Sequence, residues 1–170
     1  MLIVISGLPA TGKSAVAEVV AARTGAVQVS IDAVEDALLG AGLASGWTTG
    51  VAAYEAVRAV AEQNLLLGRT VVVDAVNDSG PARDTWRSAA ARTGRRLLFV
   101  LLTPPAAEEH RRRLEERRRG LRHLPEPSWE QVTACARSYE PWPDEPLLVD
   151  SGEPSVASAE KVLAALSALQ

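Results

Sequence analysis

The sequence has few of the features that mark secreted, membrane-embedded or zinc-dependent proteins. It contains a single cysteine, Cys135, so no disulfide can form within the chain, and we expect it to work in the reducing cytoplasm. The first apolar run, residues 2–5, is too short for a signal peptide or a membrane span, so no membrane association is expected. The two histidines, His110 and His123, are isolated, so neither a zinc site nor a Ser-His-Asp triad is predicted.

A large excess of charge is also missing. The formal net charge is −3, which gives no reason to expect nucleic acid or an anionic membrane as a partner. Positive charge is nevertheless concentrated in residues 110–122, where seven arginines and two glutamates give +5 and leave −8 on the rest of the chain. With 170 residues, 47% of them hydrophobic, the chain is expected to form a single domain over residues 1–170.

Short apolar runs alternate with segments of helical pattern along the chain. Strands are predicted over residues 2–6, 26–32, 70–75, 96–102 and 147–150. Helices are predicted over residues 13–24, 32–40, 51–67, 81–93, 104–120, 129–139 and 155–169. This alternation predicts an α/β sandwich around a parallel sheet.

The strongest motif is GLPATGKS, residues 7–14, which fits the phosphate-loop pattern G-x-x-x-x-G-K-[ST] at every fixed position. A loop that surrounds a phosphate must turn its backbone N–H groups inward, and glycines permit the required φ values and close approach. The helix that follows points its positive end at the anion. We therefore expect ATP or GTP as cofactor, bound by Gly7, Ala10, Thr11, Gly12, Lys13, Ser14 and Ala15.

Two residues are candidates for organising Mg²⁺ beside the phosphates. The motif gives Ser14 a hydroxyl for the ion, and Asp74 ends the apolar run VVVD as a magnesium-organising aspartate would, although a strand-end aspartate can also serve a turn. Many ATPases that split water carry a glutamate directly after this aspartate, whereas this chain has Ala75. The missing acid favours phosphoryl transfer to a hydroxyl group over hydrolysis.

Asp32 is the candidate catalytic base. It follows the second predicted strand, and ligands of open α/β sheets bind beyond the carboxyl ends of the strands, on the same edge as the phosphate loop. There it could accept the proton of an attacking hydroxyl. The same aspartate would also suit the N-cap of the next helix.

Substrate contacts are predicted from three further features. Asn77 lies on the edge that carries Asp74, although Asn before Gly-Pro also forms turns. Trp47, in a predicted loop over residues 41–50, and Tyr54, near the next helix start, could line a pocket or simply pack. Arg113 and Arg117 share a face if residues 104–120 are helical, and such a face could clamp the γ-phosphoryl group, while other arginines of the cluster would be solvated.

These motifs together resemble the small P-loop kinases. GLPATGKS, the aspartate after the second strand, VVVDAVN followed by PARDTW, and RRRLEERRRG are similar to chloramphenicol-phosphotransferase-like and polynucleotide-kinase-like proteins of the AAA-domain grouping. The resemblance covers residues 2 to about 150. It implies a three-layer P-loop sandwich with five parallel strands in the order 2-3-1-4-5 and an arginine-rich LID at about residues 110–128.

The resemblance also implies roles for individual residues. Lys13 and Ser14 would bind phosphate and Mg²⁺, Asp32 would be the base, and Arg113 and Arg117 would be the LID arginines, with Arg113 touching the nucleotide. Arg83, in PARDTW, would contact substrate or support the structure. The guanine-reading N-K-x-D motif is missing, so a signalling G protein is not expected.

Three functions are compatible with these residues. The first is a kinase that phosphorylates a small hydroxylated molecule, for example an antibiotic, as a monomer or homodimer. The second is a polynucleotide 5′-hydroxyl kinase, which the charge of −8 outside the arginine cluster disfavours. The third is a nucleotide-binding regulator with slow hydrolysis.

Overall fold

The computed structural model covers the 170-residue chain and describes residues 1–143 and 145–169. Within this described part the strands are β1 (Leu2–Ser6), β2 (Val27–Ser30), β3 (Val71–Asp74), β4 (Leu97–Thr103) and β5 (Leu147–Asp150). The helices are α1 (Lys13–Thr24), α2 (Ile31–Gly40), α3 (Trp47–Leu66), α4 (Gly80–Thr93), α5 (Ala107–Glu116), α6 (Trp129–Ser138) and α7 (Ser155–Ala168).

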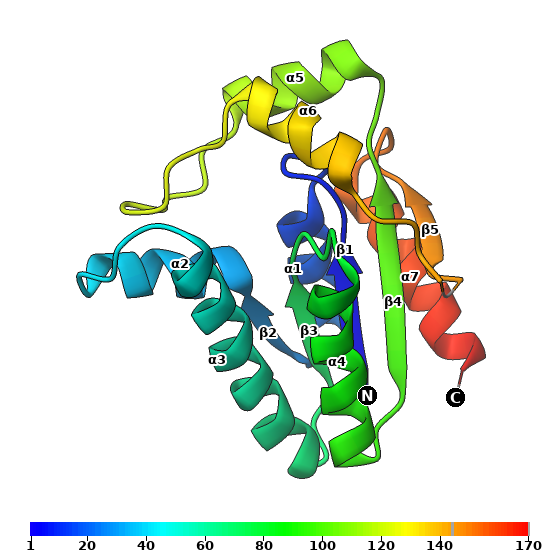
Figure 1. The fold of residues 1–170 in the computed structure, drawn as a ribbon. Coiled ribbons are helices and arrows are strands. Elements are labelled where there is room, and N and C mark those ends of the chain that lie inside the picture. Colours follow the sequence, from blue (N-terminus) through cyan, green and yellow to red (C-terminus); the bar gives the residue numbers. More distant parts are fainter. Residues whose placement is uncertain (144, 170) are drawn as a thin grey trace.

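The strands form one parallel sheet in the order β2-β3-β1-β4-β5, with β1 at its centre (Figure 1). Every residue of β1 and β3 is buried, as expected for apolar strands that have helices on both faces. The predicted α/β P-loop sandwich and its strand order are therefore confirmed.

Two separate apolar cores hold the layers together, because alternate residues of a strand face opposite sides of the sheet. Leu2 and Val4 pack with α3 and α4 on one face, where Trp86 belongs to the core. Ile3 and Ile5 pack with α1 and α7 on the other face. Helices α5 and α6 lie across the carboxyl ends of the strands (Figure 1), so these ends form the floor of a covered site.

Asp32 was predicted to end the second strand, but it lies in the first turn of α2. Strand β2 pairs with β3 only as far as Ser30, which is opposite Asp74, and the chain then leaves the sheet as a helix. Asp32 is not the N-cap of α2 either, because Ser30 occupies that position.

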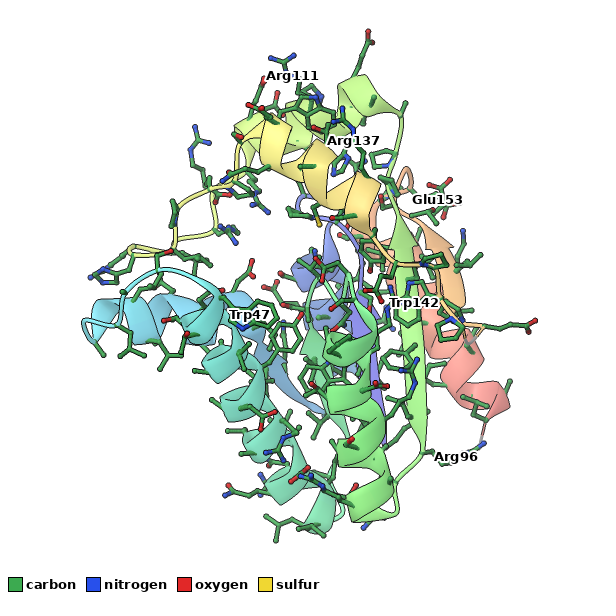
Figure 2. All side chains as sticks on the ribbon, in the orientation of Figure 1. Trp47, Arg96, Arg111, Arg137, Trp142 and Glu153 are labelled. Atoms are coloured by element: carbon green, nitrogen blue, oxygen red, sulfur yellow. The ribbon has the colours of Figure 1, made fainter. Side chains whose placement is uncertain are left out.

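Helix α5 is shorter than predicted. It ends at Glu116, and Arg117 has an extended backbone with φ −63° and ψ 147°. Arg113 and Arg117 therefore do not share a helical face, and the chain beyond α5 instead crosses toward α2 (Figure 2).

Helix α3 begins earlier than predicted, since Trp47 is its first residue and not part of a loop. Helix α6 begins as predicted, with Ser128 and Gln131 forming a reciprocal capping box. In the described part of the chain, no helix is long and apolar enough to cross a membrane.

Candidate functional site

The phosphate loop connects the buried strand β1 to helix α1 and is strongly constrained. Gly7 has φ 141°, and a Cβ at this position would lie 2.7 Å from the carbonyl oxygen of Leu102, so only glycine fits without a shift. Gly12, at the N-cap of α1, has φ 87°. Ala10 also adopts a left-handed backbone, with φ 65°. The motif's spacing thus reflects a loop that curls in front of the helix N-terminus.

Lys13 points back into this loop. Its Nζ donates a hydrogen bond to the carbonyl oxygen of Leu8 at 2.8 Å, and the Thr11 hydroxyl donates to the same carbonyl at 2.9 Å. Burial lowers the pKa of Lys13 to about 8, although the carboxylates of Asp32 and Asp74 favour its charged form. A phosphate that entered the loop would supply the counter-charge that this buried ammonium lacks.

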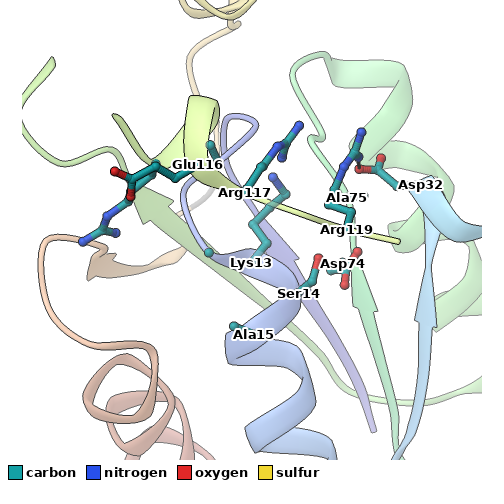
Figure 3. Close-up of a pocket in the computed structure, with 12 residues that line it drawn as sticks. Lys13, Ser14, Ala15, Asp32, Asp74, Ala75, Glu116, Arg117 and Arg119 are labelled. Atoms are coloured by element: carbon teal, nitrogen blue, oxygen red, sulfur yellow. Dashed lines mark hydrogen bonds and ion pairs between the residues drawn. The ribbon is translucent and has the colours of Figure 1, made fainter. Parts of the chain in front are cut away.

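A cavity of about 390 Å³ opens in front of the loop (Figure 3). It brings together side chains from the phosphate loop, α2, β3 and the chain at and beyond the end of α5. Its lining residues are Ala10, Gly12, Lys13, Ser14, Ala15, Asp32, Asp74, Ala75, Arg113, Glu116, Arg117 and Arg119. Six polar or charged residues predicted for the site therefore meet there, while Glu116 and Arg119 are additional.

Asp74 and Ser14 lie side by side on the floor of the cavity (Figure 3). The Asp74 Oδ1 accepts a hydrogen bond from the Ser30 hydroxyl at 2.7 Å, whereas its buried Oδ2 has no hydrogen-bond partner among the residues that the structure describes. Burial raises the pKa of Asp74, and the hydroxyls of Ser30 and Ser14 and the charge of Lys13 oppose this rise. An unpartnered carboxylate oxygen beside a hydroxyl fits the oxygen ligands that Mg²⁺ requires.

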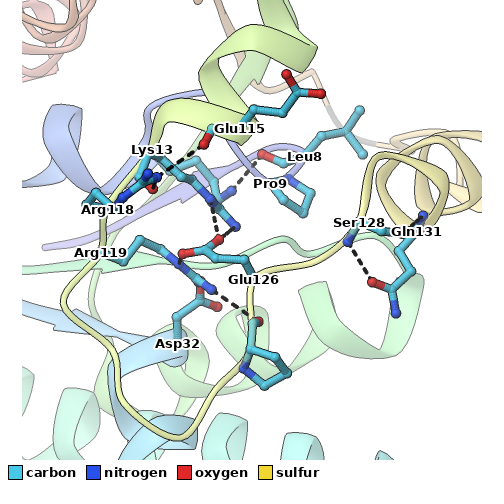
Figure 4. A network of polar contacts seen from close by, with 12 residues as sticks. Leu8, Pro9, Lys13, Asp32, Glu115, Arg118, Arg119, Glu126, Ser128 and Gln131 are labelled. Atoms are coloured by element: carbon cyan, nitrogen blue, oxygen red, sulfur yellow. Dashed lines mark hydrogen bonds and ion pairs between the residues drawn. The ribbon is translucent and has the colours of Figure 1, made fainter.

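The opposite wall of this cavity is an ionic network (Figure 4). Arg119 pairs with the Oδ2 of Asp32, and its Nε donates to Glu126 at 2.8 Å. Arg117 donates to the other oxygen of Glu126 at 2.6 Å. Both guanidinium groups are mostly buried, so their charges are only weakly screened beside the phosphate loop.

We call residues 117–126 the arginine segment. It is anchored on α2 by Asp36, whose Oδ1 accepts the backbone N–H groups of Arg122, His123 and Leu124 at 2.7–2.9 Å. These three hydrogen bonds lower the pKa of Asp36. The segment therefore spans from the end of α5 to α2, directly above the cavity.

The remaining arginines of the cluster differ in their surroundings. Arg113 donates to the carbonyl oxygen of Ser151 at 2.6 Å, which ties α5 to the loop after β5. Arg111 and Arg112 pair with glutamates of α5 itself and are exposed. They form a solvated face, as predicted for part of the cluster.

Asn77 and Arg83, predicted as substrate contacts, are completely buried. The Asn77 amide donates to the Ser6 hydroxyl at 2.9 Å and accepts from the Trp86 indole at 2.8 Å. Arg83 donates to three backbone carbonyls, those of Asn77, Glu140 and Pro141, at 2.6–3.0 Å. Because both side chains are buried and their polar groups are used in these hydrogen bonds, we interpret both as structural. For Arg83 this is one of the two predicted roles, and for Asn77 it disfavours the expected substrate contact.

Trp47 and Tyr54 lie apart from the phosphate loop, on a second cavity of about 360 Å³ between the first turns of α3 and α4. The Tyr54 hydroxyl accepts a hydrogen bond from the backbone N–H of Asn77 at 3.2 Å. Burial raises the pKa of Tyr54 well above its usual value, so it is a neutral phenol. The two aromatic residues therefore do share a cavity, next to the turn that follows β3.

His110 is a residue of the site that the sequence did not reveal. Its Nε2 lies 2.7 Å from the carbonyl oxygen of Pro9, and because a carbonyl only accepts, Nε2 carries the proton. Its ring packs edge-on against Trp129, and burial lowers its pKa. His110 thus joins α5 and α6 to the phosphate loop, a link between residues 101 positions apart for which no local motif exists.

Comparison with known proteins extends this description to family and fold. A family model described as an AAA domain matches residues 2–141. A comparison with curated protein sequences gives no match.

Several solved structures share the fold at low sequence identity. A sugar kinase from Janibacter sp. has a TM-score of 0.74 and 20% identity, over 98% of this chain and 94% of that chain. A gluconokinase from Sinorhizobium meliloti has a TM-score of 0.71 and 22% identity, over 98% and 91%. An APS kinase from Mycobacterium tuberculosis, in complex with AMPPNP and APS, has a TM-score of 0.70 and 19% identity, over 98% and 96%.

Proposed function

The chain belongs to the AAA-domain family, and from this premise we propose that it is a kinase that transfers the γ-phosphoryl group of ATP or GTP to a hydroxyl of a small molecule. One observation carries the proposal: the carboxylate of Asp32 lines the same cavity as Lys13 of the phosphate loop. The similar structures, whose names are those of small-molecule kinases, support it at the level of fold.

In this proposal the phosphate loop holds the triphosphate through its backbone N–H groups and Lys13. Arg117 and Arg119, on the opposite wall, stabilise the charge that spreads over the transferred group. Ser14 and Asp74 would hold a Mg²⁺ ion, which would neutralise phosphate charge. Most of the rate enhancement would come from positioning and from these fixed charges.

Asp32 acts as the base that accepts the proton of the acceptor hydroxyl. Its Oδ2 binds Arg119, which leaves Oδ1 for the hydroxyl. The chain carries Ala75, not a glutamate, after Asp74, so no second carboxylate follows β3 directly to activate a water molecule. This favours a hydroxyl acceptor, and a hydroxylated antibiotic is one substrate of the proposed kind.

The test combines an acceptor screen with a change of Asp32. Hydroxylated metabolites and antibiotics are incubated with ATP or GTP, and products are identified by a mass increase of one phosphate. With an acceptor in hand, Asp32→Asn is expected to lower kcat by roughly 10²–10⁴-fold, the usual contribution of a general base. Nucleotide affinity, measured by calorimetry, should change little because the phosphate loop is intact.

Asp84→Asn is a matched control, since Asp84 pairs with Arg87 on the exposed side of α4, outside the cavity. It should retain full activity. Turnover that survives in Asp32→Asn would remove Asp32 from the role of base. Nucleotide binding with slow hydrolysis and no phosphorylated product from any acceptor would instead favour a regulatory NTPase.

A further inference from the structure

The second cavity, between the first turns of α3 and α4, has an apolar wall that is open to solvent. Trp47 is 84% exposed at its rim, and Val51 is 40% exposed beside it. Tyr54, Pro81 and Ala82 line the rest of the apolar wall. Large apolar side chains around a hollow of about 360 Å³ are typical of a site that buries a small ring-bearing ligand.

The charged groups on this cavity are carboxylates, and its lining, within the described part of the chain, includes no lysine, arginine or histidine. The negative charge of Glu55 is already compensated by Arg58, which donates hydrogen bonds to its carboxylate at 2.6 and 3.0 Å. Asp78 is partly buried, and within the described residues the one hydrogen-bond partner of its side chain is the Cys135 thiol, at 3.9 Å. Asp78 therefore presents a carboxylate without a counter-ion, which would attract a cation and repel an anion.

The start of α4 could in principle favour an anion, since helix N-termini carry partial positive charge. Here that position is taken, because the backbone N–H of Gly80 donates to the Glu140 carboxylate at 2.6 Å. An anionic ligand would meet the carboxylate of Asp78 and would compete with Glu140 for the N–H group of Gly80. The helix terminus therefore does not reverse the charge preference of the cavity.

The cavity lies next to the proposed reaction centre. The Tyr54 hydroxyl on its wall binds the backbone of Asn77, which is three residues beyond Asp74 of the phosphate-loop cavity. Burial and, to a smaller extent, the charges of Asp78 and Asp32 raise the pKa of Tyr54. The labelled Trp47 side chain lies at the start of α3, on the side toward α4 (Figure 2).

We propose that this cavity binds the acceptor and selects a molecule that joins an apolar ring to a positively charged amine. This inference rests on the proposed kinase function. The ring would pack on Trp47 and Tyr54, the amine would pair with Asp78, and the hydroxyl would face Asp32. The hydroxyl gives its proton to Asp32 while its oxygen bonds to the γ-phosphorus, and the bond to the β–γ bridging oxygen breaks as the nucleoside diphosphate leaves with the electron pair.

Three probes with the same phenyl ring and hydroxyl test the charge preference. Phenylethanolamine is cationic, phenylethylene glycol is neutral and mandelate is anionic. Binding is measured by calorimetry with a non-hydrolysable ATP analogue present, and phosphate transfer with ATP or GTP is measured by mass. We expect phenylethanolamine to bind at least about fivefold more tightly than the glycol, since a partly buried ion pair contributes about 1 kcal/mol, and mandelate to bind most weakly.

Variants identify the residues that cause this order. Asp78→Asn should reduce the preference for the amine over the glycol to less than about twofold, while Asp78→Glu, which keeps the charge, should restore part of it. Trp47→Ala should weaken the binding of all three probes. Asp84→Asn, at an exposed residue of α4 that does not line the cavity, should leave the order unchanged, and thermal unfolding checks that each variant is folded.

The outcomes separate this inference from the proposed function. Three results would overturn the cationic acceptor site. Mandelate could bind as tightly as phenylethanolamine or more tightly, Asp78→Asn could keep the full preference for the amine over the glycol, or no probe could bind. Phosphorylated mandelate would also overturn this site while leaving the kinase function intact. The expected order of binding without transfer to any acceptor, in this set or in the wider screen, would leave the site standing and overturn the kinase function.

Discussion

Asn77 lies directly after the strand that carries Asp74, with a left-handed backbone (φ 54°) and a completely buried side chain. Its amide joins Ser6, the last residue of β1, to Trp86 in α4, and its carbonyl accepts from Arg83. Asparagine tolerates this backbone better than most residues do. One side chain therefore fixes both the strand before the phosphate loop and the turn that begins the second cavity.

Replacing Asn77 with alanine should destabilise the protein by about 2–4 kcal/mol, because two buried polar groups lose their partner and alanine is strained at this φ. Chemical denaturation of Asn77→Ala, Trp86→Phe and the double variant measures this loss and the coupling between the two side chains. A variant of unchanged stability with a raised KM for the acceptor would contradict the structural role and favour the original interpretation as a substrate contact.

At the scale of elements, α2 joins the two halves of the site. Asp32 and Asp36 are four residues apart, so they lie on the same face of the helix. Asp32 holds the Arg119 side chain, and Asp36 holds the backbone of residues 122–124. The position of Arg117 and Arg119 over the phosphate loop therefore depends on α2 as well as on α5.

Asp36→Ala should release the arginine segment, because three backbone N–H groups lose their common acceptor. Trypsin should then cleave after Arg117, Arg118, Arg119 and Arg122 several times faster than in the unchanged protein. Asp36→Asn is the matched control, since its side-chain oxygen can still accept these hydrogen bonds. Equal cleavage rates in Asp36→Ala and the unchanged protein would show that the segment is held by its arginine side chains alone.

At the scale of the whole molecule, positive charge is gathered in one region. The stretch 110–122 carries +5, and the rest of the chain carries −8. Within the described structure five of these arginines pair with glutamates or with Asp32. Three of the five, Arg113, Arg117 and Arg119, line the phosphate-loop cavity, and the other two lie on the solvated face of α5. A polynucleotide would need a continuous basic path toward Asp32.

We therefore expect no transfer to a labelled oligonucleotide with a 5′-hydroxyl end, and no binding of it at physiological salt. Fluorescence anisotropy measures binding, and incorporation of labelled phosphate measures transfer, with a phosphorylatable small molecule as positive control. An efficiently labelled 5′ end would contradict this prediction and favour the polynucleotide kinase.

The sequence by itself determined the fold and the phosphate-binding half of the site. Strand and helix patterns are local, and the motif from Gly7 to Ser14 specifies both a backbone conformation and its chemistry within eight neighbouring residues. Parallel strands also place their carboxyl ends on one edge, which is why Asp74 and the phosphate loop could be expected together.

Only the tertiary structure decided which other side chains join the site. His110 of α5 contacts Pro9 across 101 positions of sequence, and Arg119 of the arginine segment contacts Asp32 across 87 positions. No local pattern encodes such pairings. Burial likewise depends on the packed neighbours, and it places Asn77 and Arg83 in the interior and leaves Trp47 open on a cavity. Local rules describe the backbone of each segment, whereas the site depends on which segments the folded chain brings into contact.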